Sequence, residues 1–414
     1  MTTIKSGQWV ALQRENYVKV ALVKEKSNTA LGRDIVELGN LMDRPVWSFF
    51  SMEDAGKSKK DRRYQLTECS AEEYEESLVE ALVDDKDSDT KDNRFIKDDG
   101  QSQKLSKEEI EEMRADGVSA KDIVGQLVVN SATFEQKTVF AQEKYISKKQ
   151  RKYKKYVLVR PTSIRLVLQA LRTLSNQDPT PKLLGLRLDS LSQIVSLSGI
   201  QANSASSTFI LFDSGTQGMA TSAMIDHLSK ESNSHLIVLS CARGSSKTIA
   251  IQAMNFPSEV LSKVHYFGLA DFLKAAAQFG LVPSKEGKME IKEEEPQAKK
   301  ANSNLEAEIS LVMDQLQTEK AAALVIVAKE DPVALCDHLL PLVALSRPVV
   351  IYSQFKEPLQ EAYMKLKAQK NVTALKLKEP WLRKYQTLPE RTHPEVLMSG
   401  SGGFILHGLT VESD

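Results

Sequence analysis

The spacing of apolar residues changes along this chain, and the first pattern predicts strands. Residues 4–66 carry short runs of Val, Leu and aromatic residues that partly alternate with polar ones. Turn sequences such as Arg-Glu-Asn at 14–16 separate the runs. Alternation with period two is the signature of half-buried strands, and several short strands in succession favour a small barrel or sandwich. We therefore expect a β-barrel domain over residues 1–83.

A helical pattern follows a charged stretch. Residues 84–93, DDKDSDTKDN, lack any apolar periodicity and are typical of an exposed linker. Ser106 and Glu109 have the spacing of a capping box, in which each side chain accepts the other's backbone N–H. The apolar stripe of a later helix comprises Phe134, Val139, Phe140 and Tyr145. We expect residues 84–156 to form an acidic linker and a basic helical connector.

Strand and helix patterns alternate from residue 157 to residue 414. The runs YVLVR, STFILFDSG, HLIVLSC, AAALVIVA and RPVVIYSQF read as strands, and helical segments follow most of them. This alternation predicts an α/β domain with a mostly parallel sheet, closed by the strands VTALKLKEPW and GGFILHGLTV. A charged insertion near 284–304 interrupts it, and we expect that insertion to be disordered.

Composition narrows the function classes. Lys plus Arg and Asp plus Glu each number 55, so the chain is not a wholly basic nucleic-acid-binding protein. Its three cysteines form no CxxC pair and its six histidines show no HxxxH spacing, so we predict neither a metal site nor a disulfide framework. The first residues lack the apolar core of a signal peptide, and no window approaches a membrane span. We expect a soluble, intracellular protein of two or three domains.

Positive charge is nevertheless concentrated in one stretch. From Lys144 to Arg165 there is no Asp or Glu, and Tyr153 and Tyr156 are interleaved. Charges at this density repel one another unless an anion is present, and nucleic-acid phosphate is the obvious partner. The candidate RNA contacts here are Lys144, Lys148, Lys149, Arg151, Lys152, Lys154 and Lys155. A nuclear-import signal or a solvated helix end would explain the same run.

A second mixed segment extends from Trp381 to Pro394. It combines aromatic side chains with the basic residues Arg383, Lys384 and Arg391. Such residues are enriched at interface hot spots, and they also suit RNA contact. The alternative is a loop braced by prolines and packed on its own domain.

The strand that ends at Asp213 is the place where an α/β sheet of this kind holds a nucleotide-like cofactor. S-adenosylmethionine methyltransferases have an acidic residue there, followed by glycines at alternate positions. Asp213, Gly215 and Gly218 match this pattern in part, but Gln217 and Met219 stand where glycines are expected. The next strand ends in SCARG, with no carboxylate for a ribose. We predict a Rossmann-like methyltransferase fold with a degenerate cofactor site, without catalytic residues; the alternative is a functional variant that uses Asp213.

Four stretches of the chain resemble one protein family over most of residues 5–410. They are DNRFIKDDGQSQKLS, NSATFEQKTVFAQEKYISKKQRKY, SRPVVIYSQFKEPLQEAY and WLRKYQTLPERTHPEVLMSGSGGFILHG. The family is the non-catalytic, tRNA-binding subunit of the eukaryotic tRNA (adenine-58-N1)-methyltransferase.

This resemblance implies a function in tRNA modification. It implies a β-barrel followed by a methyltransferase-like domain that binds no cofactor, with S-adenosylmethionine on the catalytic partner. It also implies a nuclear heterotetramer, with two copies of each subunit, that methylates N1 of a T-loop adenosine. Two alternatives stay open: an active S-adenosylmethionine-dependent RNA methyltransferase that uses the degenerate loop Asp213–Gly218, and a scaffold without an RNA role whose basic run only directs import.

Overall fold

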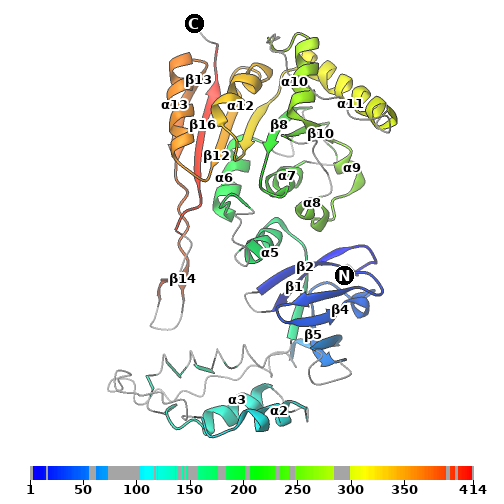
Figure 1. Ribbon diagram of the computed structural model, residues 1–414, viewed down its shortest axis with the longest axis vertical. Helices are drawn as coiled ribbons and strands as arrows, with labels where there is room; N and C mark the ends of the chain where they lie inside the picture. The colour runs from blue at the N-terminus through cyan, green and yellow to red at the C-terminus, as the bar shows by residue number, and fades with distance from the viewer. Residues whose placement is uncertain are drawn as a thin grey trace. The chain divides into compact units, whose positions relative to one another are not determined.

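The chain forms two compact units, Met1–Pro161 and Thr162–Asp414, in the computed structural model shown in Figure 1. The structure describes residues 3–14, 17–55, 62–72, 103–115, 118, 120–135, 137–138, 141–142, 145–146, 149, 156–175, 183–200, 206–228, 231, 233–241, 248–283, 299–387, 392–396 and 400–412. No helix in these ranges is long and apolar enough to cross a membrane. Each unit is described by itself below.

The first unit is a small, barrel-like sheet of seven strands in the order β2-β1-β7-β5-β6-β4-β3. The strands are β1 (Trp9–Arg14), β2 (Tyr17–Leu22), β3 (Asn28–Leu31), β4 (Asp34–Glu37), β5 (Ser48–Asp54), β6 (Arg63–Cys69) and β7 (Tyr156–Pro161), with a 3-10 turn, η1 (Gly39–Leu41), after β4. Alternate residues such as Val10, Leu12 and Phe50 point into one core. The predicted β-barrel is confirmed.

Strand β7 corrects one prediction. We expected YVLVR to open the α/β domain, but it lies in the barrel sheet, antiparallel to both β1 and β5. Its two valines, Val157 and Val159, are fully buried in the barrel core. An alternating pattern of this kind suits a strand with one buried face, whereas the parallel strands of an α/β sheet are buried on both faces.

Two described helices lie between β6 and β7: α2 (Lys107–Ala115) and α3 (Ala120–Val129). The predicted capping box is confirmed, because the Ser106 N–H donates to Glu109 at 2.8 Å and the Glu109 N–H donates to the Ser106 hydroxyl at 3.1 Å. Val124 and Leu127 pack with Phe134 in a small separate core. The predicted linker at 84–93 lies outside the described residues.

The second unit has a seven-stranded sheet in the order β10-β9-β8-β11-β12-β16-β13. The strands are β8 (Thr208–Asp213), β9 (His235–Ser240), β10 (Val264–Gly268), β11 (Ala323–Val327), β12 (Pro348–Ser353), β13 (Val372–Lys378) and β16 (Phe404–Thr410). The run from β10 to β12 is parallel, and β16 is antiparallel to both of its neighbours. This is the predicted mostly parallel α/β sheet.

Helices cover both faces of this sheet (Figure 1). They are α5 (Ile164–Ser175), α6 (Leu188–Ser198), α7 (Met219–Ile225), α8 (Ile249–Ala253), α9 (Ser258–Leu261), α10 (Leu269–Gln278), α11 (Lys299–Thr318), α12 (Pro332–Leu339) and α13 (Glu357–Gln369), with the 3-10 turn η5 (Leu340–Leu342). The insertion predicted near 284–304 lies outside the described residues up to 298, and its last residues belong to α11.

A narrow extension separates β13 from β16 and leads away from the sheet of the second unit (Figure 1). It contains the short antiparallel strands β14 (Tyr385–Gln386) and β15 (His393–Pro394). We call residues 379–403 the β-arm. The β-arm therefore holds the mixed aromatic and basic segment that the sequence singles out.

Candidate functional site

The sheet of the second unit changes direction at β8. From β8 the chain builds β9 and β10 on one side and then crosses to β11 on the other. The carboxyl end of β8 is therefore the topological switch point, where open α/β sheets bind their ligands. Asp213 ends β8, and a short loop leads from it into α7. The sequence places its candidate cofactor residues at this edge, and so does the structure.

Both carboxylate oxygens of Asp213 are engaged within the chain. Oδ1 accepts the hydroxyl of Thr216, and Oδ2 accepts the hydroxyl of Thr221 at 2.6 Å and its backbone N–H at 3.1 Å. Burial raises the pKa of Asp213 by more than these hydrogen bonds lower it. Asp213 thus ties the loop to the first turns of α7.

Thr216 continues this closure. Its oxygen accepts the backbone N–H groups of Met219 at 3.1 Å and Ala220 at 3.3 Å. Free N–H groups at a helix start are what attract an anionic ligand group. Here Thr216 satisfies two of them and Asp213 satisfies a third, on Thr221.

The glycines of the loop have packing reasons of their own. Gly215 (φ +90°) and Gly218 (φ +77°) both have left-handed backbone conformations. A Cβ on Gly215 would lie 3.2 Å from Leu184, and one on Gly218 would overlap Thr248. Gln217 is also left-handed, at φ +56°, although it carries a full side chain. The loop therefore has left-handed backbone at three positions, one of which is a half-buried glutamine.

The neighbouring strand offers no acid for a ribose. Strand β9 ends at Ser240, the exposed Cys241 follows, and residues 242–247 lie outside the described part. A carboxylate does reach this edge from beyond β11, where Glu330 accepts the Ser214 hydroxyl at 2.8 Å. Asp331 caps α12 by accepting two backbone N–H groups. The polar groups described at this edge bind mainly to one another.

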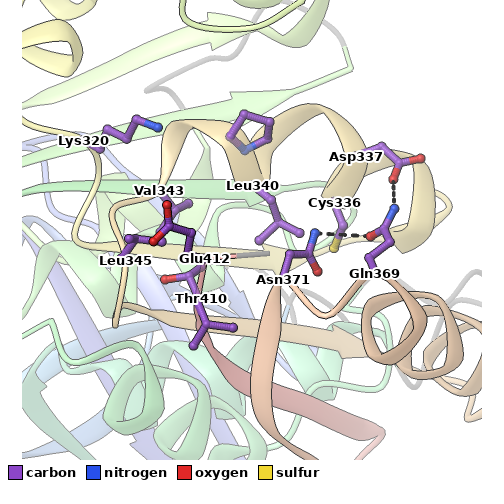
Figure 2. Close-up of a pocket in the computed structure, with 12 residues that line it drawn as sticks. Lys320, Cys336, Asp337, Leu340, Val343, Leu345, Gln369, Asn371, Thr410 and Glu412 are labelled. Carbon is purple, nitrogen blue, oxygen red and sulfur yellow. Dashed lines mark hydrogen bonds between the residues drawn. The ribbon is translucent and has the colours of Figure 1, made fainter. Parts of the chain in front are cut away.

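A separate pocket lies at the other end of the strands from Asp213, near the residues that lead into β11, β12 and β13 (Figure 2). It encloses about 310 Å³, and Figure 2 shows the amide of Gln369 directed at Asp337 and that of Asn371 directed at Gln369. Asp337 also pairs with Lys365. Because these groups bond across the rim, and the pocket is remote from Asp213, we assign it no part in the function.

The structure describes only part of the predicted basic run. Lys149 is half-buried, with its Nζ 5.2 Å from the centre of the Tyr145 ring, and Lys137 stacks on that ring at 4.9 Å. Tyr145 is itself held edge-to-face by Phe134. The other candidates of the run lie outside the described residues: Lys144, Lys148, Arg151, Lys152, Lys154 and Lys155.

The β-arm exposes its aromatic and basic residues. Trp381 is 73% exposed, with the Arg383 guanidinium 6.0 Å from its ring centre, and Lys384 and Tyr385 are exposed as well. The predicted alternative, a loop packed on its own domain, is therefore wrong for Trp381 and Tyr385. Arg391 lies outside the described residues.

The base of the β-arm is clamped to the sheet. Arg187 forms a two-point ion pair with Asp189 and donates to the Pro380 carbonyl at 3.1 Å. On the returning strand, Ser190 donates to the Gly402 carbonyl, and a Cβ on Gly402 would lie 2.7 Å from Arg187 Nε. The exposed arm is thus held at both of its connections.

One pair of an exposed ring and a half-buried arginine escaped the sequence prediction. Trp47 in the barrel is 56% exposed, and the Arg160 guanidinium lies 4.6 Å from its ring centre. Sequence spacing gives no signal for this pair, because strand pairing across the barrel brings β7 next to the turn before β5.

Comparison with known proteins agrees with this architecture. Residues 3–308 match the Gcd10p family. The chain is 30% identical to the mouse tRNA (adenine(58)-N(1))-methyltransferase non-catalytic subunit TRM6, over 99% of this chain and 89% of the mouse protein. It is 28% identical to the Dictyostelium discoideum protein of the same name, over 99% of this chain and 79% of that protein.

A solved structure supports the fold alone. The SAM-dependent O-methyltransferase from Thermotoga maritima superposes with a TM-score of 0.51 at 9% identity, covering 100% of this chain and 96% of that one. The Rossmann-like methyltransferase fold predicted from the sequence is therefore confirmed. Together with the match over residues 3–308, this places the chain in the Gcd10p family, the family of the non-catalytic subunits of tRNA (adenine-58-N1)-methyltransferase.

Proposed function

We propose that this chain is the non-catalytic subunit of a tRNA (adenine-58-N1)-methyltransferase, that it binds no S-adenosylmethionine, and that it holds tRNA for a catalytic partner. The observation that carries the proposal is the closure of the Asp213 loop by Thr216 and Thr221. The relatives named above are non-catalytic subunits, which supports this function and not an active methyltransferase.

The chemistry of the loop disfavours cofactor binding. S-adenosylmethionine presents an amino-acid group to the glycine-rich loop and two ribose hydroxyls to an acid on the next strand. In this chain Asp213 and the first N–H groups of α7 already have partners, and β9 ends without a carboxylate. To bind there, the cofactor would have to break hydrogen bonds that the fold itself uses.

The role toward tRNA is supported by charge. The basic run extends from Lys144 to Lys155. RNA binding is favoured when these positive charges neutralise phosphates, because the neutralised phosphates release their counterions. Contacts of this kind set position and orientation on the RNA without reading its sequence. Arg383, Lys384 and Arg391 on the β-arm are further candidates.

The catalytic partner requires a surface, and the β-arm suits one. Trp381 and Tyr385 expose aromatic area on an arm whose base is fixed by Arg187. Aromatic anchors on a rigid element lower the entropy lost on association. We propose that the two subunits form a heterotetramer, with two copies of each, and that the complex works in the nucleus.

The experiment measures tRNA methylation and S-adenosylmethionine binding for this chain alone, its partner alone and the co-expressed pair. We expect methylation by the pair and no cofactor binding by this chain. Methyl transfer by this chain alone, or micromolar cofactor affinity that Asp213→Ala removes, would establish the active-enzyme alternative instead.

A second experiment tests the basic run in the assembled complex. Replacing Lys148, Lys149, Arg151 and Lys152 with alanine should weaken tRNA binding and lower the slope of log affinity against log salt by about 0.7–0.9 for each phosphate that is no longer neutralised. The control replaces four exposed lysines elsewhere: Lys24, Lys26, Lys274 and Lys320. If both variants show the wild-type slope, the run makes no phosphate contacts.

A further inference from the structure

Trp47 has an unfavourable backbone conformation on the surface of the barrel. It lies in the turn before β5 at φ +72°, a left-handed conformation that costs a bulky residue free energy. The turn fixes it there, because the Trp47 N–H donates to the Val159 carbonyl at 2.8 Å. Strained residues of this kind are found where function requires one side-chain placement.

The Arg160 side chain fixes the ring from one side. Its guanidinium lies 4.6 Å from the Trp47 ring centre, and its Nη1 donates to the Gln13 side chain at 2.7 Å. Within the described part of the chain Arg160 has no carboxylate partner, and its Nε is buried without an acceptor. The pair therefore combines a positioned aromatic ring with an unneutralised positive charge.

The remaining ring surface is available to a ligand. Trp47 is 56% exposed even though Arg160 covers one side. Flat aromatic rings backed by arginine are the surfaces on which unpaired bases stack, because every base has a π-face and the cation adds to the attraction.

Charge favours RNA over a protein as the occupant. The basic run ends at Lys155, immediately before β7, and Arg160 lies on that strand. Five residues of extended chain span at most about 17 Å, so the run ends within that distance of Arg160. A protein hot spot would also use Trp and Arg, but it would need no dense cationic run beside it.

We propose that Trp47 and Arg160 form a stacking platform for one unpaired nucleobase of the bound tRNA. This inference rests on the proposed function, since it requires that the chain binds tRNA. The platform holds a base through stacking, while the neighbouring basic run holds the phosphates.

The test uses the co-expressed complex and measures its tRNA affinity at one reference salt concentration and over a series of salt concentrations around it. Trp47→Leu should weaken binding about tenfold, the effect expected when one base–aromatic stack is removed. Trp47→Phe, which keeps a ring, should stay within about threefold of wild type. The slope against salt should not change in either variant, because the phosphates stay neutralised by the same side chains.

Two further variants control for a loss of stability and for the removal of an exposed apolar side chain. Trp47→Gly suits φ +72° and relieves the strain, so it should melt within about 2 °C of the wild type and still lose affinity about tenfold. Leu311 on α11 is similarly exposed, at 53%, and Leu311→Ala should leave the tRNA affinity unchanged.

The outcomes separate this inference from the proposed function. Wild-type affinity in both Trp47→Leu and Trp47→Gly overturns the platform while tRNA binding by the complex stands. Loss of co-purification with the catalytic partner, with unchanged affinity of the complex that does assemble, assigns Trp47 to a protein contact and also overturns it. A wild-type complex that binds no tRNA refutes the proposed function itself.

Discussion

Replacing Asp213 tests whether the cofactor loop has become an internal brace. Asp213→Ala removes the acceptor for two hydroxyls and for the backbone N–H of Thr221. Thr221 is only 2% exposed, so water cannot readily replace the missing acceptor. If the brace is the role of Asp213, the effect should appear in stability and not in ligand binding.

The magnitude follows from those three hydrogen bonds. A hydrogen bond to a charged acceptor contributes about 1.5–3 kcal/mol, and a buried N–H left without a partner costs about 1–3 kcal/mol. Burial of the charge, which raises the pKa of Asp213, offsets part of this. We expect Asp213→Ala to lower the free energy of unfolding by about 3 kcal/mol. For a unit of this size that corresponds to a melting temperature lower by about 6–12 °C.

Asp213→Asn is the matched control. Its amide oxygen can still accept from Thr221, its amide N–H can face Thr216, and the cost of burying a charge disappears. We expect the free energy of unfolding to fall by at most about 1 kcal/mol. The assays are chemical unfolding and calorimetric titration with S-adenosylmethionine. The brace would be refuted if Asp213→Ala were as stable as the wild type and abolished S-adenosylmethionine binding that the wild-type chain shows.

Two further predictions concern stability. Gly403 has φ +76°, and a Cβ added to it would overlap the ring of Tyr352. Gly403→Ala should therefore destabilise the base of the β-arm by about 3 kcal/mol, measured by thermal unfolding. An unchanged melting temperature would contradict the clamp. Burial lowers the pKa of His235, and the nearby charges of His265 and Lys263 lower it further. Below the unperturbed pKa of about 6.5 the unfolded state therefore binds more protons than the folded state, so stability should fall as pH drops through and below that value. His235→Gln should flatten this dependence in denaturant unfolding between pH 7.5 and 5.5; an equally steep curve would place the effect elsewhere.

Local features of the fold were predictable from the sequence. The capping box depends on Ser106 and Glu109, which are only three positions apart, and it appears as expected. The pairing of β7 with β1 and β5 was not predictable, since the chain returns to the barrel after the two helices α2 and α3. Strand length and alternation do not say to which sheet a strand belongs.

The candidate site likewise has features that the sequence predicts and features that only the structure shows. Asp213 and its glycines can be placed at the sheet edge from sequence, because a strand followed by a glycine-rich turn ends at the switch point. The engagement of Asp213 by Thr221 required the structure, since threonine in a helix gives no signal of its partner. Trp47 and Arg160 come together only through the barrel sheet.

The remaining glycines of the loop have roles in the fold that do not involve a cofactor. Both glycines have left-handed backbone, and an added Cβ would press against the Leu184 side chain at Gly215 and overlap the Thr248 side chain at Gly218. At position 217 the chain accommodates a glutamine at φ +56°, and at position 219 it buries a methionine completely. Each glycine that remains thus has a reason within the protein, and neither needs a ligand to explain it. The partial methyltransferase pattern in this chain follows from the β8-to-α7 turn and is not by itself a sign of cofactor binding.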